Sequence, residues 1–121
     1  MNKPEIAHFD ASAEFYTEER CYIIEFLNEG SEGVSIARAR VEPGVTTAWH
    51  RLAATVERYV IEAGRGRVEV GQLPPTEVGP GDTVVIPAGE RQRITNTGTD
   101  DLLFLCICSP GFRATNYESL E

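Results

Sequence analysis

The chain has 121 residues, of which 41% are hydrophobic and 25% are charged, as is ordinary for a single globular domain. Its formal net charge of −8 argues against a nucleic-acid partner, because binding to DNA or RNA depends on lysine and arginine side chains that neutralise phosphates. Apolar runs in the sequence fall well short of the ~20 residues that span a bilayer, so we expect no membrane partner.

The cysteines and the N-terminus predict a cytoplasmic location. Residues 1–5 lack the apolar stretch of a signal peptide. The three cysteines, Cys21, Cys106 and Cys108, are odd in number and form no CxxC pair, so a disulfide framework is not indicated. A reducing compartment fits this pattern.

In chain order, short β-rich runs alternate with turn signals, and no long segment has a helical period. The first run, residues 21–27, ends at a turn cluster, Asn28-Glu29-Gly30. The second, residues 35–41, alternates so that Ala37, Ala39 and Val41 share one face. Small residues on that face suit a crowded barrel interior.

The remaining runs complete an all-β pattern. Helix is expected only in short pieces near residues 10–18 and 116–120. The spacing of strands and turns predicts one sandwich or barrel domain over residues 1–121, without repeats or linkers. The further candidate strands are residues 46–52, 58–61, 66–70, 83–86, 92–96 and 102–108.

Alternation along two neighbouring strands predicts a polar pocket. Residues two apart on a strand share a face, so His50 lies beside Leu52, and Glu57 lies beside Tyr59. If these faces line the interior, Gln92 joins them from a later strand. Buried polar groups are costly unless they are satisfied, so these side chains need either a metal ion or one another as partners.

Two gapped motifs in the chain resemble the two signature motifs of the cupin family, as found in small single-domain cupins. The resemblance implies a single cupin β-barrel or jelly roll of two antiparallel sheets, often dimeric, with a metal or ligand at its centre. The first motif spans residues 44–64 and the second residues 81–96: Gly44-(five)-His50-Arg51-Leu52-(four)-Glu57-(six)-Gly64, and Gly81-(five)-Pro87-Ala88-Gly89-(two)-Gln92-(three)-Asn96.

The resemblance also implies a metal site, because the usual cupin ligands are three histidines and one glutamate. His50 and Glu57 match two of these positions, whereas Leu52 and Gln92 replace the other two histidines. A set of His50, Glu57 and Gln92 predicts weak binding of a divalent ion, with Mn²⁺ favoured and Fe²⁺, Ni²⁺ or Zn²⁺ as alternatives. A metal-free pocket, in which His50 and Glu57 form a hydrogen-bonded pair, is the competing interpretation. His8 is either a substitute ligand or a surface histidine.

The site residues are compatible with three functions. The first is isomerase- or lyase-type proton transfer on a polar, oxygen-rich small molecule, with Glu57 or Tyr59 as the catalytic group. The second is a non-catalytic module that binds or senses a small ligand, and the third is a metal-dependent dioxygenase, whose metal triad is incomplete here. Cys106 and Cys108 are either small buried apolar residues or thiols that line the pocket.

A homodimer is the expected assembly. Barrels of this type expose edge strands, which proteins tend to cover. About 20 residues precede the first clear strand, and this N-terminal segment could cover such an edge across a dimer.

Overall fold

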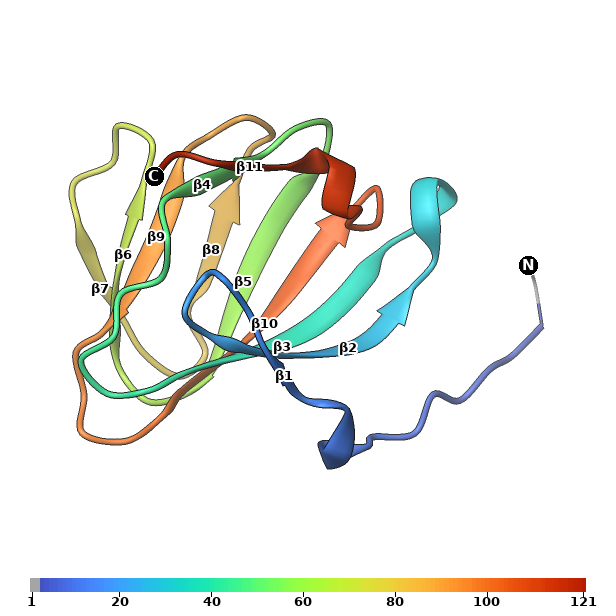
Figure 1. Ribbon diagram of the computed structural model, residues 1–121, viewed down its shortest axis with the longest axis horizontal. Coiled ribbons are helices and arrows are strands. Elements are labelled where there is room, and N and C mark those ends of the chain that lie inside the picture. The colour runs from blue at the N-terminus through green and yellow to red at the C-terminus, as the bar shows by residue number, and fades with distance from the viewer. Residues whose placement is uncertain (1–2) are drawn as a thin grey trace.

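The computed structural model describes residues 3–121, which form two antiparallel sheets that face each other as a barrel (Figure 1). The first sheet has the order β1-β2-β3-β10-β5-β8, and the second has the order β11-β4-β9-β6-β7. The strands are β1 (Phe15–Tyr16), β2 (Tyr22–Asn28), β3 (Ser35–Val41), β4 (His50–Leu52), β5 (Val56–Ala63), β6 (Gly66–Val70), β7 (Thr76–Val78), β8 (Thr83–Ile86), β9 (Gln92–Asn96), β10 (Leu102–Ser109) and β11 (Tyr117–Ser119).

Helical structure in the described residues is limited to three short 3₁₀ turns, η1 (Ala11–Ala13), η2 (Gly30–Glu32) and η3 (Ala114–Asn116). The expected helix over residues 116–120 is wrong. That segment is strand β11, which pairs antiparallel with β4 and places Tyr117 opposite Leu52. Pairing with strand β4 of the second sheet thus determines the conformation of this short polar segment, in place of its local helical preference. Among residues 3–121, no helix is long and apolar enough to cross a membrane.

Two strands, one in the first motif and one between the two motifs, also differ from expectation. Residues 46–52 were expected as one strand, but the regular strand begins only at His50, with an isolated bridge between Thr46 and Thr95 before it. Strand β7 follows the Leu73-Pro74-Pro75 turn and was not expected, because three residues leave too short a pattern to recognise.

The predicted interior faces are confirmed. Ala39 and Val41 on β3 are 2% and 0% exposed, and the core between the sheets is completed by Ile61, Ile94 and Leu102. Full burial of such side chains contributes about 1.5–3 kcal/mol each, which is enough to fix which face of each strand turns inward. His50 and Leu52 on β4 are both buried with exposed Arg51 between them, and Glu57 and Tyr59 on β5 are buried with half-buried Arg58 between them.

The motif glycines are explained by backbone geometry at the turns. Gly64 has a φ of +87°, which favours glycine, and a Cβ there would lie 2.7 Å from the carbonyl oxygen of Asp101. The other motif glycines that share a positive φ are Gly44, Gly81 and Gly89.

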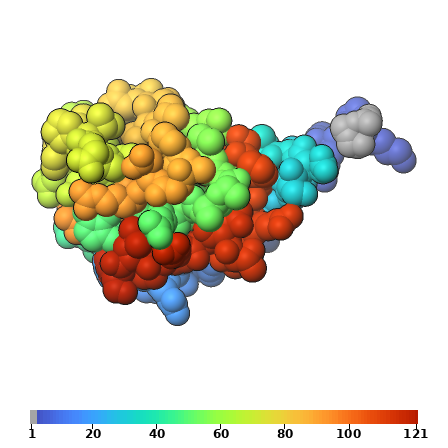
Figure 2. All heavy atoms as spheres, turned by 90° about the horizontal axis from the view of Figure 1, so that it is seen from above, coloured from blue at the N-terminus to red at the C-terminus, as the bar shows by residue number. Residues whose placement is uncertain are grey.

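The described N-terminal segment, which begins at residue 3 and precedes β1, leaves the rounded body of the protein (Figures 1 and 2). Phe9 packs edge-to-face on Phe26 of β2, with ring centroids 6.2 Å apart, yet it is 60% exposed. Ile6 is 79% exposed. His8 lines a second hollow between this segment and β2 and takes no part in lining the barrel cavity described below.

Candidate functional site

A cavity of about 360 Å³ lies inside the barrel, within the size range of small-molecule sites. Strands β2, β3, β5 and β10 of the first sheet form its wall, and β4 contributes His50 and Leu52. Its mouth is bordered by the β1–β2 turn and by the segment that ends in β11. The predicted residues His50, Glu57 and Tyr59 all line this cavity, and Gln92 is fully buried beside it.

His50 is held in one orientation by contacts on one of its ring nitrogens. Nδ1 lies 3.0 Å from the carbonyl oxygen of Ala48, which can only accept, so Nδ1 carries the proton and donates. The same nitrogen is 3.5 Å from the Glu19 carboxylate. The imidazole also stacks on Tyr117, with ring centroids 5.0 Å apart. In the neutral ring Nε2 is therefore the acceptor, and it makes no hydrogen bond with the described residues.

Glu57 is a buried carboxyl group without a full set of partners. It is 7% exposed, and its Oε1 has no hydrogen-bond partner within residues 3–121. Burial raises the pKa of Glu57 to about 7, and the nearby Glu19 carboxylate adds to the rise. Polar interactions with the Gln92, Cys106 and Cys108 side chains lower the pKa of Glu57 in part. A carboxyl group with such a pKa can both donate and accept a proton near neutral pH.

Gln92 lies between Tyr59 and Glu57. The Tyr59 hydroxyl donates to Oε1 of Gln92 in a short hydrogen bond, while the amide Nε2 has no partner that meets hydrogen-bond geometry in the described chain. The amide group is thus turned with its oxygen towards Tyr59. Burial, followed by the negative charge at Glu57, raises the pKa of Tyr59 well above its usual value, so the hydroxyl stays protonated.

The cysteines of β10 line the cavity next to Glu57, as one of the two interpretations predicted. Cys108 lies opposite Glu57 in the strand register, and Cys106 lies opposite Tyr59. Burial raises the pKa of Cys108 to about 12 and that of Cys106 well above the usual thiol value. Both are therefore neutral thiols that are poor nucleophiles.

Two residues at the mouth, Glu19 and Tyr117, were not found from the sequence. Glu19 lies in the β1–β2 turn, and burial raises its pKa although the neighbouring His50 lowers it in part. Neither residue belongs to a recognisable motif. The sequence shows only that an acidic residue precedes the barrel strands and that an aromatic residue follows them. Such positions do not indicate that both side chains reach His50.

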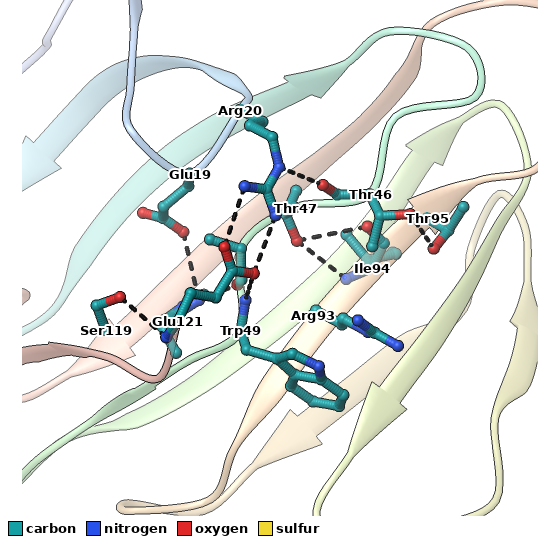
Figure 3. Close-up of polar contacts among 12 residues, drawn as sticks. Glu19, Arg20, Thr46, Thr47, Trp49, Arg93, Ile94, Thr95, Ser119 and Glu121 are labelled. Carbon is teal, nitrogen blue, oxygen red and sulfur yellow. Dashed lines mark hydrogen bonds and ion pairs between the residues drawn. The ribbon is translucent and has the colours of Figure 1, made fainter.

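The mouth segments are tied together by Arg20 and Glu121 (Figure 3). The Arg20 guanidinium donates to both carboxylate oxygens of Glu121, at 3.1 and 3.0 Å, and to the carbonyl oxygen of Thr46 at 2.9 Å. Glu121 also accepts the backbone N–H of Trp49 at 2.8 Å. These contacts link the β1–β2 turn, the segment that leads into β4 and the C-terminal segment at one end of the barrel.

The donors for a metal ion are incomplete. Neither His50 Nε2 nor Glu57 Oε1 has a hydrogen-bond partner among the described residues, whereas the Gln92 oxygen already accepts the Tyr59 hydroxyl, and Leu52 offers no donor. Within residues 3–121, no group of three histidine, cysteine, aspartate or glutamate side chains is arranged to hold an ion. Protein metal sites generally use three or four side-chain ligands, so the residues present do not fit a tightly held ion.

Residues 37–108, more than half of the chain, match the cupin domain family. Together with the two-sheet barrel and its central cavity, this match shows that the chain belongs to the cupin family. An uncharacterised protein of Methanocaldococcus jannaschii, MJ1618, is 32% identical over 116 residues, which cover 93% of this chain and 92% of that protein.

Two solved structures share the fold. A conserved protein with a double-stranded β-helix domain from Klebsiella pneumoniae superposes with a TM-score of 0.79 at 16% identity, over 97% of this chain and 99% of that chain. The Streptomyces nucleoside dehydratase Pac13 superposes with a TM-score of 0.78 at 11% identity, over 97% of this chain and 92% of that chain. At these identities the likeness shows the fold alone.

Proposed function

We propose that this cupin is an isomerase or lyase that transfers a proton to or from a small molecule bound in the barrel cavity. Glu57 is the acid–base group. The observation that carries the proposal is the position of Glu57, which lines the cavity, is 93% buried and has an unpartnered Oε1. Its pKa of about 7 is near the value at which a general acid–base group works best at neutral pH.

The other site residues suit supporting roles in this reaction. The Glu57 carboxylate takes a proton from a carbon next to a carbonyl, and the electron pair of the C–H bond moves towards the carbonyl oxygen. In an isomerisation the proton returns to a neighbouring atom. In an elimination a C–O bond breaks instead, and the departing oxygen takes the proton. His50 and Gln92 orient the substrate and Glu57, and Tyr59, which was a second candidate for the catalytic group, holds Gln92 in place.

Pac13 supports a reaction of this class without fixing its substrate. A dehydratase removes water, which is an elimination, and Pac13 performs it on a nucleoside within the same barrel fold. Two further structures pair its tyrosine variants with uridine, and a third pairs a histidine variant with it. Small-molecule proton-transfer chemistry is therefore compatible with a cupin of this size.

The proposal is tested by hydrogen exchange. Carbonyl compounds, sugars and nucleosides are incubated with the protein in D₂O, and NMR follows the loss of carbon-bound hydrogen or the appearance of a new product. We expect exchange into at least one compound, with no exchange in Glu57→Gln. Ligand binding without exchange, in all compounds that bind, would favour the alternative function of a non-catalytic binding or sensing module.

The dioxygenase alternative is less well supported. The two-histidine, one-carboxylate triad of non-haem iron oxygenases needs a second imidazole, and Leu52 stands at the position that should supply it. Oxygen consumption in the presence of Fe²⁺ and a bound substrate would favour this alternative over proton transfer.

Weak metal binding by His50, Glu57 and Gln92 stays a prediction. An ion bound there would supply Lewis-acid polarisation of a substrate oxygen. Because only two donors are unshared, we expect protein purified without chelator to carry well under one Mn²⁺, Fe²⁺, Ni²⁺ or Zn²⁺ per chain, and His50→Ala to carry none. Elemental analysis measures both. Stoichiometric metal in the wild type would show that the donor set is larger than the one described.

We also propose that the protein is a cytoplasmic homodimer in which the N-terminal segment contacts a second copy. The support is the exposure of Ile6 and Phe9 on an extended segment beside the edge of the first sheet. Sedimentation velocity at micromolar concentration is expected to give a dimer, and deletion of residues 1–9 is expected to shift it towards monomer. A monomeric full-length chain would contradict the proposal.

A further inference from the structure

The charges around the cavity are all of one sign. Four glutamates line it: Glu19 and Glu57 within the cavity wall, and Glu18 and Glu25 at exposed positions of its border. Among residues 3–121, no lysine or arginine side chain lines this cavity. An anionic ligand would therefore enter a negative field without a counter-charge, which opposes binding.

Within the part of the chain that the structure describes, the inner carboxyl groups have no cationic partner except an imidazole. Glu57 Oε1 is buried and without a hydrogen bond, and the Glu19 carboxylate reaches only His50, at 3.5 Å. A buried carboxyl group without a partner is costly, so its presence at a cavity wall points to a partner that arrives with the ligand.

Two of the arginines on the outer faces of the sheets are paired with carboxylates away from the cavity. Arg40 binds Glu14 and Asp101 on the outside of the first sheet. Arg93 binds Glu69 on the second sheet, at 2.6 Å. These two charges are thus committed to ion pairs away from the inner carboxyl groups, and none of the other lysine or arginine side chains of residues 3–121 lines the cavity.

Aromatic rings supply the rest of the lining. Phe15, Phe104, Phe112, Tyr59 and Tyr117 border the cavity, and Tyr59 and Phe104 are in contact, with ring centroids 4.6 Å apart. Aromatic faces attract organic cations, and they also cover the apolar part of an amine. Acidic groups combined with aromatic rings, without basic groups, are the complement of a small organic cation.

We infer that the ligand of this cavity is a small organic cation, an amine or a quaternary ammonium compound with an apolar portion, and that anionic compounds are excluded. The inference rests on the proposed function to the extent that this ligand is the substrate of Glu57. It narrows the substrate class from oxygen-rich compounds in general to those that carry a positive charge.

The test uses three probes of similar size and shape that differ in charge: 2-phenylethylammonium, 2-phenylethanol and phenylacetate. Affinities are measured by calorimetry and ligand-observed NMR at about pH 8, with EDTA present so that a metal ion cannot bridge the carboxylate. We expect the ammonium compound to bind on the order of tenfold more tightly than the alcohol, as hydrogen bonds to charged groups suggest. Phenylacetate should show no binding at millimolar concentration.

Variants assign the preference to the cavity. Glu57→Gln should abolish the difference between the ammonium compound and the alcohol, and Glu25→Gln at the exposed border should reduce it by about two- to fivefold. Glu25 is exposed, so its variant is informative even if Glu57→Gln folds poorly. Glu62→Gln, an exposed change on the same strand as Glu57, should leave all three affinities unchanged.

Three results would overturn the inference: equal binding of the ammonium compound and the alcohol, binding of phenylacetate, or no binding of any probe. The proposed reaction and the cationic ligand can be disproved independently of each other. If ammonium preference is found but no compound exchanges hydrogen in D₂O, the acid–base role of Glu57 is wrong while the cationic ligand stands. If exchange occurs only on neutral or anionic compounds, the cationic ligand is wrong while the acid–base role of Glu57 stands.

Discussion

Glu57→Gln is expected to slow the proposed proton exchange by about 10²–10⁴-fold, the usual contribution of a general acid–base group. The same change should remove the loss of stability that the wild type shows as the pH rises through 7. Both effects have one origin, because Glu57 is buried with its Oε1 unpartnered. The proposed function at this position therefore opposes stability, as is common for catalytic groups held in a protein interior.

The direction of the stability change follows from the raised pKa of Glu57. The pKa is about 7 in the folded protein and about 4.5 for the free side chain, so the folded state holds the proton more tightly. Stability from this group is fully present below about pH 4.5 and is lost as the pH rises through 7. A pKa difference of about 2.5, at 1.36 kcal/mol per pKa unit, corresponds to about 3 kcal/mol lost above pH 7.

Urea unfolding of the wild type and Glu57→Gln between pH 4 and 8 measures this difference. The stability of the variant relative to wild type should rise by about 3 kcal/mol over that range. Any cost of burying an unpaired amide does not depend on pH and cancels in the comparison. Glu62→Gln, exposed on the same strand, is the matched control and should parallel the wild type. Parallel curves for all three proteins would show that Glu57 is ionised normally.

Leu52→His is expected to convert the cavity into a tight metal site. Leu52 is 3% exposed and lies on the same face of β4 as His50, so an imidazole there joins His50 and Glu57 as a third unshared donor. Four-ligand zinc sites are worth roughly 10–16 kcal/mol, or about 3 kcal/mol per ligand. We therefore expect Zn²⁺ or Mn²⁺ to bind on the order of 100-fold more tightly than in the wild type.

Calorimetric titration with Zn²⁺ and Mn²⁺ measures the gain, and circular dichroism checks that the variant is folded. His50→Ala in the Leu52→His background should return the affinity to the wild-type range. Leu52→Phe fills the same position without a donor and should bind no better than the wild type. A folded Leu52→His protein without improved affinity would mean that residue 52 does not reach the metal position that the cupin motif implies.

The sequence was sufficient to predict those features that depend on the backbone conformation of one residue or on the alternation within one strand. Positive φ angles at Gly44 and Gly64 reflect a conformation that other residues rarely adopt, so the motif glycines predicted the turns. Alternation with a period of two placed His50 beside Leu52 and Glu57 beside Tyr59 on buried faces. Such features depend on near neighbours in the chain.

The sequence was insufficient where distant segments meet. Tyr117 stacks on His50 because β11 pairs with β4, and the same residues had been expected to be helical. Glu19 reaches His50 because the β1–β2 turn folds over the mouth of the barrel, where Arg20 binds Glu121 across 101 residues of chain. No local pattern encodes these approaches.

By itself, the sequence determined that this protein is a cupin barrel with His50, Glu57, Tyr59 and Gln92 turned inward, since turn geometry and strand alternation are local properties. Only the tertiary structure decided the chemical character of the cavity. The raised pKa of Glu57, the engagement of Gln92 by Tyr59 and the absence of basic side chains from the cavity lining of residues 3–121 all arise from packing. Burial and the charges of distant neighbours control these properties, because both depend on which segments come together in space.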